Sequence, residues 1–249
     1  MPNKNAAKYV EKMTGGELSS LSQTDPEFYE LFCNFAFDEV INEHPLPDRV
    51  RHLAILATLL GCGGTDAFSG EVAAALHFGV TAAEIKEVIY QAVAYLGIGR
   101  VLPFFNIANS RLVREGAELP TEPRATVTAD SRISDGENKQ VEIFGEGMRG
   151  FSRRGGETEH INRWLSGNCF GDYYTRKGLS DSDREMITFC YLAAQGGCEP
   201  QLTSHAAANM RIGNDKQFLI CVVSQCLPYI GYPRSLNALT CISKASEMK

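Results

Sequence analysis

The chain has 249 residues, an apolar fraction of 44% and a formal net charge of −6 at pH 7, so it can form one large domain or two of ordinary size. Acidic and basic residues alternate without long runs of one sign, which argues against a nucleic-acid surface or a polybasic membrane patch. The first residues lack the apolar run of a signal peptide, and no segment is apolar over the length of a bilayer. We therefore expect a cytoplasmic protein with a small-molecule substrate, without nucleic-acid or membrane partners.

The cysteine and histidine spacings predict no metal site. The sequence has eight cysteines, but no two of them form a C-x-x-C pair, and the histidines lack the spacing of metal ligands. In a reducing compartment we expect free thiols, several of them as small core residues.

The first half is predicted to be entirely helical. Residues 1 to about 16 are polar and predict a segment that either frays or packs as a short arm. Apolar residues then recur every three or four positions. A helix is predicted from Pro26, a second one from Asp48 to about Gly61, and further ones at 71–78, 82–94 and 103–112; Thr81 and Glu84 form a capping box for the fourth.

A polar stretch then divides the chain. Residues 115–140 are rich in Pro, Thr, Ser, Asp and Gly without an apolar period, and we interpret them as a linker. We predict a first module at 17–114 and a second at 141–249, where helical periodicity returns.

The two modules are copies of one another. An offset of 133 positions relates Arg51 to Arg184 and Gly63-Gly64 to Gly196-Gly197. After a one-residue slip, an offset of 134 relates Gln91 to Gln225 and Tyr95-Leu96-Gly97 to Tyr229-Ile230-Gly231.

The copies differ at polar positions. Glu185 aligns with His52, and His205 aligns with Glu71. Either the first module only supports the second, or His52 and Glu71 form a second site in which the two residue types are exchanged.

The stretch from Arg184 to His205 carries the candidate chemistry. It places Glu185, Cys198 and His205 on two apolar segments joined by a Gly-Gly turn. A carboxylate, a thiol and an imidazole are the groups that transfer protons and act as nucleophiles.

Several motifs in the second half resemble the carboxymuconolactone decarboxylase family. They are F-G-D-Y-Y-T-R-K-G-L at 170–179, the Arg184-Glu185 helix, S-H-A-A-A at 204–208 and Q-C-L-P-Y-I-G-Y-P-R-S-L-N-A-L at 225–239. The first half resembles the family more weakly, through G-V-T-A-A-E-I-K-E-V-I-Y-Q-A-V-A-Y-L-G at 79–97. The chain is thereby identified as a two-module member of the alkylhydroperoxidase D-like superfamily.

The resemblance implies an all-α fold, a tandem repeat of two six-helix-type modules. It also implies a homo-oligomer, and two modules per chain suggest a trimer that reproduces a six-module ring. Some relatives decarboxylate a lactone without a cofactor, and others are thiol reductases of peroxide defence.

The resemblance makes His205 the candidate general acid and base, because its position matches the histidine of the decarboxylase motif. Imidazole titrates near neutrality and can give or take a proton. Glu185 either orients His205 or only complements the dipole of its helix.

Cys198 is the one cysteine that we expect to be reactive, because a helix N-terminus lowers the pKa of a thiol. The C-x-x-C of the peroxidase branch is absent, since Gln201 stands in place of the second cysteine. A dithiol cycle is therefore not expected. Gln201, one turn before His205, is a candidate to hydrogen-bond the ring or a substrate.

Arginines and aromatic residues complete the predicted substrate site. Arg176 matches the arginine of the decarboxylase motif, and Arg184 adjoins Glu185; either could clamp a carboxylate. Further candidates for the same wall are Asp172, Tyr173 and Tyr174.

Three functions remain open on the sequence. The first is a cofactor-independent decarboxylase-type lyase for a small carboxylated lactone or related acid. The second is a single-thiol, peroxiredoxin-like antioxidant that uses Cys198, and the third is a non-catalytic oligomeric binding protein.

Overall fold

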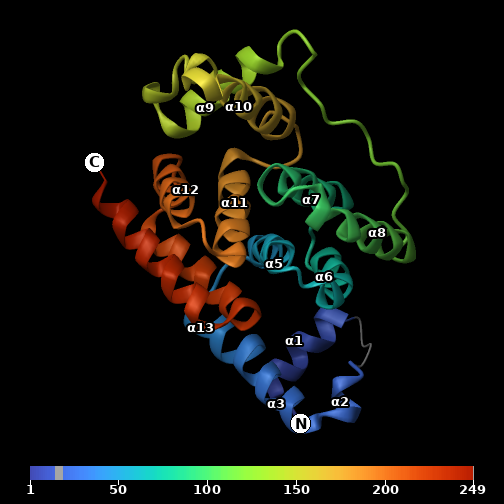
Figure 1. The fold of residues 1–249 in the computed structure, drawn as a ribbon. Helices are drawn as coiled ribbons and strands as arrows, with labels where there is room; N and C mark the ends of the chain where they lie inside the picture. Colours follow the sequence, from blue (N-terminus) through green and yellow to red (C-terminus); the bar gives the residue numbers. More distant parts are fainter. Residues whose placement is uncertain (15–18, 249) are drawn as a thin grey trace.

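The computed structural model describes residues 1–14 and 19–248, and all regular elements in these residues are helices (Figure 1). The prediction of an all-α fold of two modules is confirmed. The predicted start of the first module at residue 17 lies outside the described residues. The first half contains α1 (Lys4–Thr14), α2 (Leu21–Thr24), α3 (Pro26–Asn34), the π-helix η1 (Phe35–Glu39), α4 (Val40–Glu43), α5 (Asp48–Cys62), α6 (Thr65–His77), α7 (Ala82–Leu96) and α8 (Ile98–Arg114).

The second half repeats this order after an extended segment that runs along one side of the molecule from α8 to α9 (Figure 1). Its elements are α9 (Arg132–Phe144), the 3-10 turns η2 (Glu146–Met148), η3 (Phe151–Arg153) and η4 (Gly156–Thr158), α10 (Glu159–Trp164), the π-helix η5 (Leu165–Tyr174), α11 (Asp181–Gln195), α12 (Glu199–Arg211) and α13 (Lys216–Glu247).

The internal repeat appears in the backbone. Helices α5 and α6 correspond to α11 and α12, and the α7–α8 pair corresponds to the long helix α13. The break between α7 and α8 lies at Gly97, with φ of 77°, and α13 is interrupted at the equivalent Gly231, with φ of 74°. Only glycine adopts this left-handed region without strain.

Local sequence chemistry sets the helix starts. The predicted capping box at Thr81 and Glu84 begins α7, and Ser180 with Asp183 forms an equivalent box at α11. Each box pairs backbone donors that the first helical turn leaves without partners.

Two predicted boundaries differ from the structure. The N-terminal segment packs, one of the two predicted alternatives, but it does so as a regular helix, α1, which lies against α6 with Ala6 fully buried. Part of the expected linker is α9, which begins at Arg132. Its buried positions are Gly136, Gln140 and Ile143, so two of the three inward residues are not apolar and the helical period was hidden.

A third boundary differs at α8. This helix begins at Ile98, five residues before the predicted start, and contains Pro103 in its second turn. Because Pro103 lies beyond the first turn, it removes the intrahelical bond that an N–H at this position would make to the carbonyl of Gly99.

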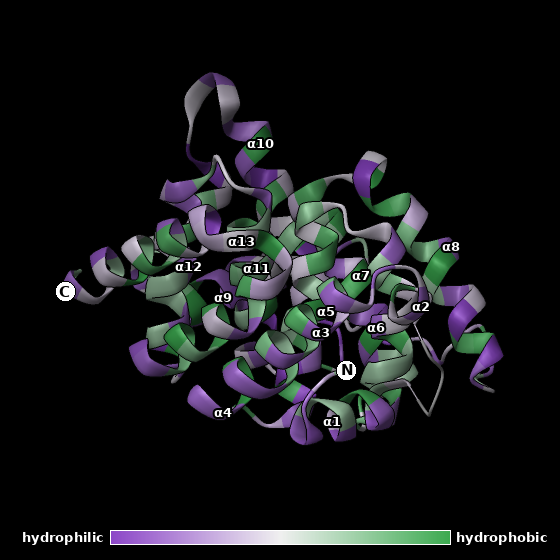
Figure 2. Cartoon of the chain, turned by 90° about the horizontal axis from the view of Figure 1, so that it is seen from below, coloured by the Kyte–Doolittle hydropathy of each residue, from purple (hydrophilic) through white to green (hydrophobic). Residues whose placement is uncertain are grey.

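Helices α5 and α11 cross at the centre and join the two modules into one core (Figure 1). Their close approach depends on Gly61, where a Cβ atom would come within 2.7 Å of Tyr191 O and Ala194 Cβ. Apolar residues concentrate on these central helices, and hydrophilic residues lie toward the periphery (Figure 2).

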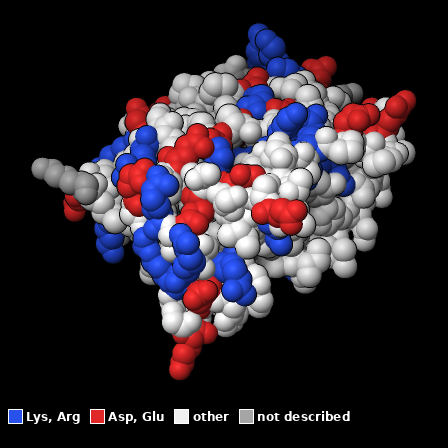
Figure 3. Space-filling view, turned by 90° about the horizontal axis from the view of Figure 1, so that it is seen from above, with Lys and Arg blue, Asp and Glu red and all other residues white. Residues whose placement is uncertain are grey.

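The outer surface carries both signs of charge. On the face in Figure 3, acidic and basic side chains lie interspersed. None of the described helices is both long and apolar enough to cross a membrane. Within residues 1–14 and 19–248, no three His, Cys, Asp or Glu side chains are grouped as metal ligands.

Candidate functional site

His205 and Glu185 form a buried pair between two adjacent helices. The Nδ1 atom of His205, on α12, lies 2.8 Å from Oε2 of Glu185, on α11. The histidine side chain is 10% exposed and the carboxylate is fully buried. Asn209, one turn after His205, donates from Nδ2 to the backbone oxygen of Glu185 at 2.9 Å and ties the two helices together.

A directed chain of hydrogen bonds converges on the other oxygen of Glu185. Tyr174 donates from its hydroxyl to Glu185 Oε1 at 2.8 Å. Because that proton is committed to the carboxylate, the Tyr174 oxygen accepts from the hydroxyls of Tyr95 at 2.9 Å and Thr188 at 2.7 Å. Gln91 Nε2 in turn donates to Thr188 at 2.8 Å.

Burial keeps the two tyrosines of this chain protonated. It raises the pKa of Tyr95 and of Tyr174 well above the usual value of 10.0. Both remain donors near neutrality, so Tyr174 can donate to the Glu185 carboxyl group, whose other oxygen faces the imidazole. Tyr95 belongs to the first module, which therefore completes the site of the second.

The free edge of the imidazole lies beside aromatic side chains. The ring centroids of Phe144 and Tyr95 lie 5.2 and 5.5 Å from that of His205, both edge to face. Within the part of the chain that the structure describes, His205 Nε2 has no hydrogen-bonding partner. With Nδ1–H donated to Glu185, Nε2 is available as a base in the neutral ring and as an acid in the protonated ring.

A cavity of about 730 Å³ lies between α9, α12 and α13, and its lining includes Ser204 and Ala207 of α12 but not His205 itself. Phe144 belongs both to its wall and to the packing around His205. Among the described residues that line it, the cationic side chain is Arg211, at the end of α12. The wall is formed by Phe144, Met148, Ser204, Ala207, Ala208, Met210, Arg211, Ala245, Ser246 and Met248.

Arg176 and Arg184, which were predicted to bind a substrate carboxylate, bind a glutamate of the protein instead. Both guanidinium groups bind Glu87 of the first module: Arg176 Nη2 lies 2.9 Å from Oε1 and Arg184 Nη2 lies 3.1 Å from Oε2. Arg184 also donates to Gln91 Oε1 at 2.8 Å. Glu87 is only 1% exposed, and a buried carboxylate requires such partners. Neither arginine lies in the cavity wall beside His205.

Cys198 precedes α12 as predicted, but its thiol is not activated. Burial raises its pKa above the usual value of 9.0, so the expectation of a lowered pKa is wrong. The Sγ atom donates to Leu192 O at 3.4 Å, a bond that favours the thiol over the thiolate. We therefore propose no thiol chemistry here. Gln201 is exposed to solvent and makes no hydrogen bond to His205.

Of the remaining candidates, only Tyr174 enters the site. Asp172 forms an ion pair with Arg132 and accepts from Asn168 Nδ2 at 3.0 Å. Tyr173 is half-buried, and burial raises the pKa of its hydroxyl.

The first module contains the exchanged pair. His52 Nδ1, on α5, lies 2.6 Å from Glu71 Oε1, on α6, and both side chains are buried. Unlike His205, His52 has its second nitrogen engaged, 3.1 Å from the hydroxyl of Tyr9 on α1. The structure thus brings together the two residues that the repeat singled out.

Several site residues escaped the sequence analysis, namely Tyr95, Phe144, Thr188, Asn209, Arg211 and Tyr9. A usable signal existed for Tyr95, which is matched by Tyr229 in the repeat. For the others, the fold alone brings distant positions together.

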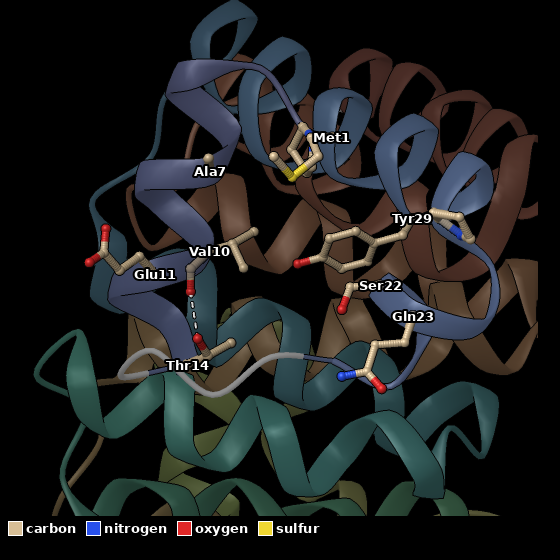
Figure 4. Close-up of a pocket in the computed structure, with 10 residues that line it drawn as sticks. Met1, Ala7, Val10, Glu11, Thr14, Ser22, Gln23 and Tyr29 are labelled. Carbon is tan, nitrogen blue, oxygen red and sulfur yellow. Dashed lines mark hydrogen bonds between the residues drawn. The ribbon is translucent and has the colours of Figure 1, made fainter.

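A further cavity of about 550 Å³ lies between α1 and the α2–α3 segment (Figure 4). Val10, Ser22 and Tyr29 line it, and neither histidine–glutamate pair does. Its wall offers no acid–base pair, so we place the candidate chemistry at His205.

Comparison with known proteins shows the family of the chain. The sequence model of the carboxymuconolactone decarboxylase family matches residues 26–110 and 160–243. A 4-carboxymuconolactone decarboxylase of Acinetobacter baylyi is 32% identical over 88 residues, 35% of this chain and 66% of that protein. The chain therefore spans slightly less than two thirds of that relative.

A solved structure shares the fold. It is a candidate gamma-carboxymuconolactone decarboxylase subunit from Burkholderia xenovorans, with 19% identity and a TM-score of 0.55. The similarity covers 98% of this chain and 97% of that one, so the two-module arrangement is shared over almost the full length.

Proposed function

We propose that this chain, which belongs to the carboxymuconolactone decarboxylase family, is a carboxy-lyase that acts on a small carboxylated lactone or a related acid. The observation that carries the proposal is the buried His205–Glu185 pair. Phe144 packs on the imidazole and also lines the neighbouring cavity. The match to the Acinetobacter baylyi enzyme supports the substrate class.

In the proposed reaction, His205 supplies the proton that replaces carbon dioxide. The bond between the substrate carbon and its carboxylate breaks, and the electron pair moves into the adjacent unsaturated system. The protonated Nε2 of His205 then delivers its proton to the carbon at the far end of that system, and solvent restores the proton. Glu185 stabilises the imidazolium before transfer and fixes the ring orientation.

We assign recognition of the substrate carboxylate to Arg211. It is the cationic side chain in the cavity wall, whereas Arg176 and Arg184 are occupied by Glu87. An arginine fork binds a carboxylate through two parallel hydrogen bonds. This chemistry needs an acid, a base and a cation, all of which the protein supplies, and the proposal includes no cofactor.

The test is release of carbon dioxide from 4-carboxymuconolactone by the purified chain. His205→Gln should lower kcat by about 10²–10⁴-fold, the usual contribution of general acid–base catalysis. His160→Gln is the matched control, because His160 is an exposed histidine on α10. Undiminished turnover in His205→Gln would overturn the mechanism.

Glu185→Gln separates positioning from mere stability. The amide can still accept from Nδ1–H but cannot stabilise the imidazolium, so kcat should fall while KM stays similar. The midpoint of the pH–rate profile should move to lower pH, a change that a structural role would not produce.

We also propose that the chain assembles as a homotrimer. Ile98 and Leu102 on α8 are exposed, and so are Tyr232 and Leu236 at the equivalent positions of α13. Matching apolar patches on both modules suit a closed ring of copies. Light scattering that gives a monomer mass would refute this arrangement.

A further inference from the structure

The first module contains a relay that ends on a phenol. Glu71 Oε1 accepts Nδ1–H of His52 at 2.6 Å, which leaves Nε2 as an acceptor. Nε2 accepts from the Tyr9 hydroxyl at 3.1 Å, and Arg51 Nη1 donates to the same hydroxyl at 2.8 Å. One lone pair of the Tyr9 oxygen remains unused.

We propose that Glu71, His52 and Tyr9 form a second acid–base site, which transfers a proton to or from a planar aromatic or unsaturated carboxylic acid. It is separate in residues and position from the site at His205. The proposal goes beyond the decarboxylase function and does not depend on it.

The cavity beside Tyr9 suggests the ligand class. It has a volume of about 650 Å³ and lies between α1, η1 and α5. Phe37 and Phe78 in its wall stack on Tyr9, with centroid distances of 5.7 and 5.0 Å. Parallel aromatic walls favour a planar ligand.

Two ammonium groups border the same cavity, on Lys8 and Lys12. Lys12 Nζ lies 3.9 Å above the Phe78 ring and 3.5 Å from Asp48 Oδ2, and among the described residues Lys8 forms no ion pair. Of the acidic side chains in the wall, Asp38 already accepts hydrogen bonds from Asn3, Asn5 and Asn42. A ligand carboxylate would therefore bind at Lys8 and Lys12, where it would replace Asp48 as the partner of Lys12, with its planar body against the aromatic wall.

The environment of Tyr9 suits a proton carrier. Burial raises the pKa of Tyr9 to about 12, and Arg51 opposes that shift. The resting group is thus a phenol that donates to His52, and Arg51 is placed to stabilise a phenolate once the proton has left.

The proposed step conserves protons and electrons. The Tyr9 proton moves to His52 Nε2, and the resulting imidazolium is compensated by Glu71. The phenolate oxygen then removes a proton from an acidic C–H of the ligand, whose bonding electrons enter the conjugated acid. In the reverse direction, the imidazolium re-protonates Tyr9 as the phenol returns its proton to carbon.

Phenylpyruvate is the probe that tests this site, because it is an aromatic carboxylate with an acidic C–H. Deuterium exchange at that carbon is followed by NMR in D₂O with the full-length chain. We expect at least a tenfold acceleration over buffer. Tyr9→Phe keeps the stacked ring but should reduce exchange to the buffer rate, and so should His52→Gln.

Two lysine variants, one in the cavity wall and one elsewhere on the surface, test where the ligand carboxylate binds. Lys12→Gln should raise the KM for exchange about tenfold, whereas Lys216→Gln, at an exposed lysine on α13, should not. Far-UV circular dichroism and thermal melting establish that each variant is folded.

Two results would overturn the proposal. The first is a wild-type chain that exchanges deuterium into phenylpyruvate no faster than buffer alone, or no faster than the Tyr9→Phe variant. The other is exchange that is lost in His205→Gln but retained in Tyr9→Phe, which would assign it to the second module. Decarboxylation of the lactone is measured separately, so either function can fail alone.

Discussion

The two modules place a histidine and a glutamate at the same pair of backbone positions, but in exchanged order. In the second module the imidazole projects from α12, and its Nε2 has no hydrogen-bonding partner among the described residues. In the first it projects from α5, and Tyr9 of α1 covers Nε2. Because the two positions face one another, the pair survives the exchange while the reactive nitrogen moves to another helix. A repeat can thus keep its scaffold and change its chemistry.

Neither module is complete without the other. Tyr95 of the first module joins the hydrogen bonds around Glu185. Its counterpart in the second module is Tyr229, which lies near Glu71 of the first. Burial, and next the negative charge of Glu71, raise the pKa of Tyr229 well above 10.0. Arg51 donates to Gln225 at 3.0 Å, as Arg184 does to Gln91. The modules therefore form an intramolecular pair.

Exchange of the residue types in the second module should have the largest effect. The double variant Glu185→His/His205→Glu recreates the order of the first module, so it should fold. Decarboxylation should nevertheless fall by about 10²–10⁴-fold, because Nε2 would project from α11 instead of α12 and would no longer be placed for proton transfer. Carbon dioxide release and the melting temperature measure the two outcomes. Activity within tenfold of wild type would show that the position of the histidine is unimportant.

Substitutions at Glu87 and at its counterpart compare how much equivalent positions of the two modules contribute to the free energy of unfolding. Its equivalent in the second module is Cys221. Glu87→Gln leaves the fully buried Arg184 without a carboxylate, and loss of one partner of a buried pair costs about 3–5 kcal/mol. Cys221→Ala should cost less than about 1 kcal/mol, since no buried charge depends on it. Urea unfolding measures both, and equal losses would contradict the role of Glu87.

The crossing of α5 and α11 can be tested at equivalent positions. Gly61→Ala should destabilise by about 1–3 kcal/mol, because the new Cβ would overlap Tyr191 O. Ala194→Gly, at the matching position, removes a methyl group and should cost about 1 kcal/mol through helix propensity. A stabilised Gly61→Ala would mean that the helices can separate freely.

The sequence predicted those features that local rules determine. The capping box at Thr81 and Glu84 predicted the start of α7. The internal repeat singled out the positions of His52, Glu71, Glu185 and His205, which form the two histidine–glutamate pairs. Such features depend on spacing within one segment or on comparison of the two copies.

Contacts between side chains of different modules were not predicted, because each side chain has several chemically suitable partners. Arg176 and Arg184 suited a carboxylate clamp until the fold placed Glu87 beside them, 89 and 97 positions away. Tyr9 was missed because α1 is polar on average, and its partner His52 is 43 positions distant. A single sequence does not show which of several suitable partners the fold selects.

Tyr95→Phe tests whether the second site needs the first module. Loss of the hydroxyl removes one donor to Tyr174 but keeps the ring against His205. We expect about a tenfold fall in kcat for decarboxylation, the effect of one hydrogen bond in a buried network. Tyr229→Phe, at the equivalent position, should leave decarboxylation unchanged. A similar loss in both variants would indicate a general effect on packing.

The smallest effect is expected at the capping boxes, where Arg49 joins the modules. Its Nη2 lies 2.6 Å from Glu84 at the start of α7 and 3.0 Å from Asp183 at the start of α11. Burial alone would raise the pKa of Glu84, but hydrogen bonds from Thr81 and Arg49 outweigh it, so the pKa lies below the usual 4.5.

A carboxylate with a lowered pKa stabilises the fold above its unfolded-state value and loses that contribution as the pH falls through its folded-state value. Glu84→Gln should therefore cost about 1 kcal/mol at pH 7, the usual effect of a cap. The difference from wild type should shrink below pH 4.5, where the wild-type carboxylate takes up its proton. Urea unfolding at pH 7 and at pH 3 measures it. If the difference in unfolding free energy between wild type and Glu84→Gln is the same at both pH values, the loss comes from side-chain packing and the charge of Glu84 does not contribute.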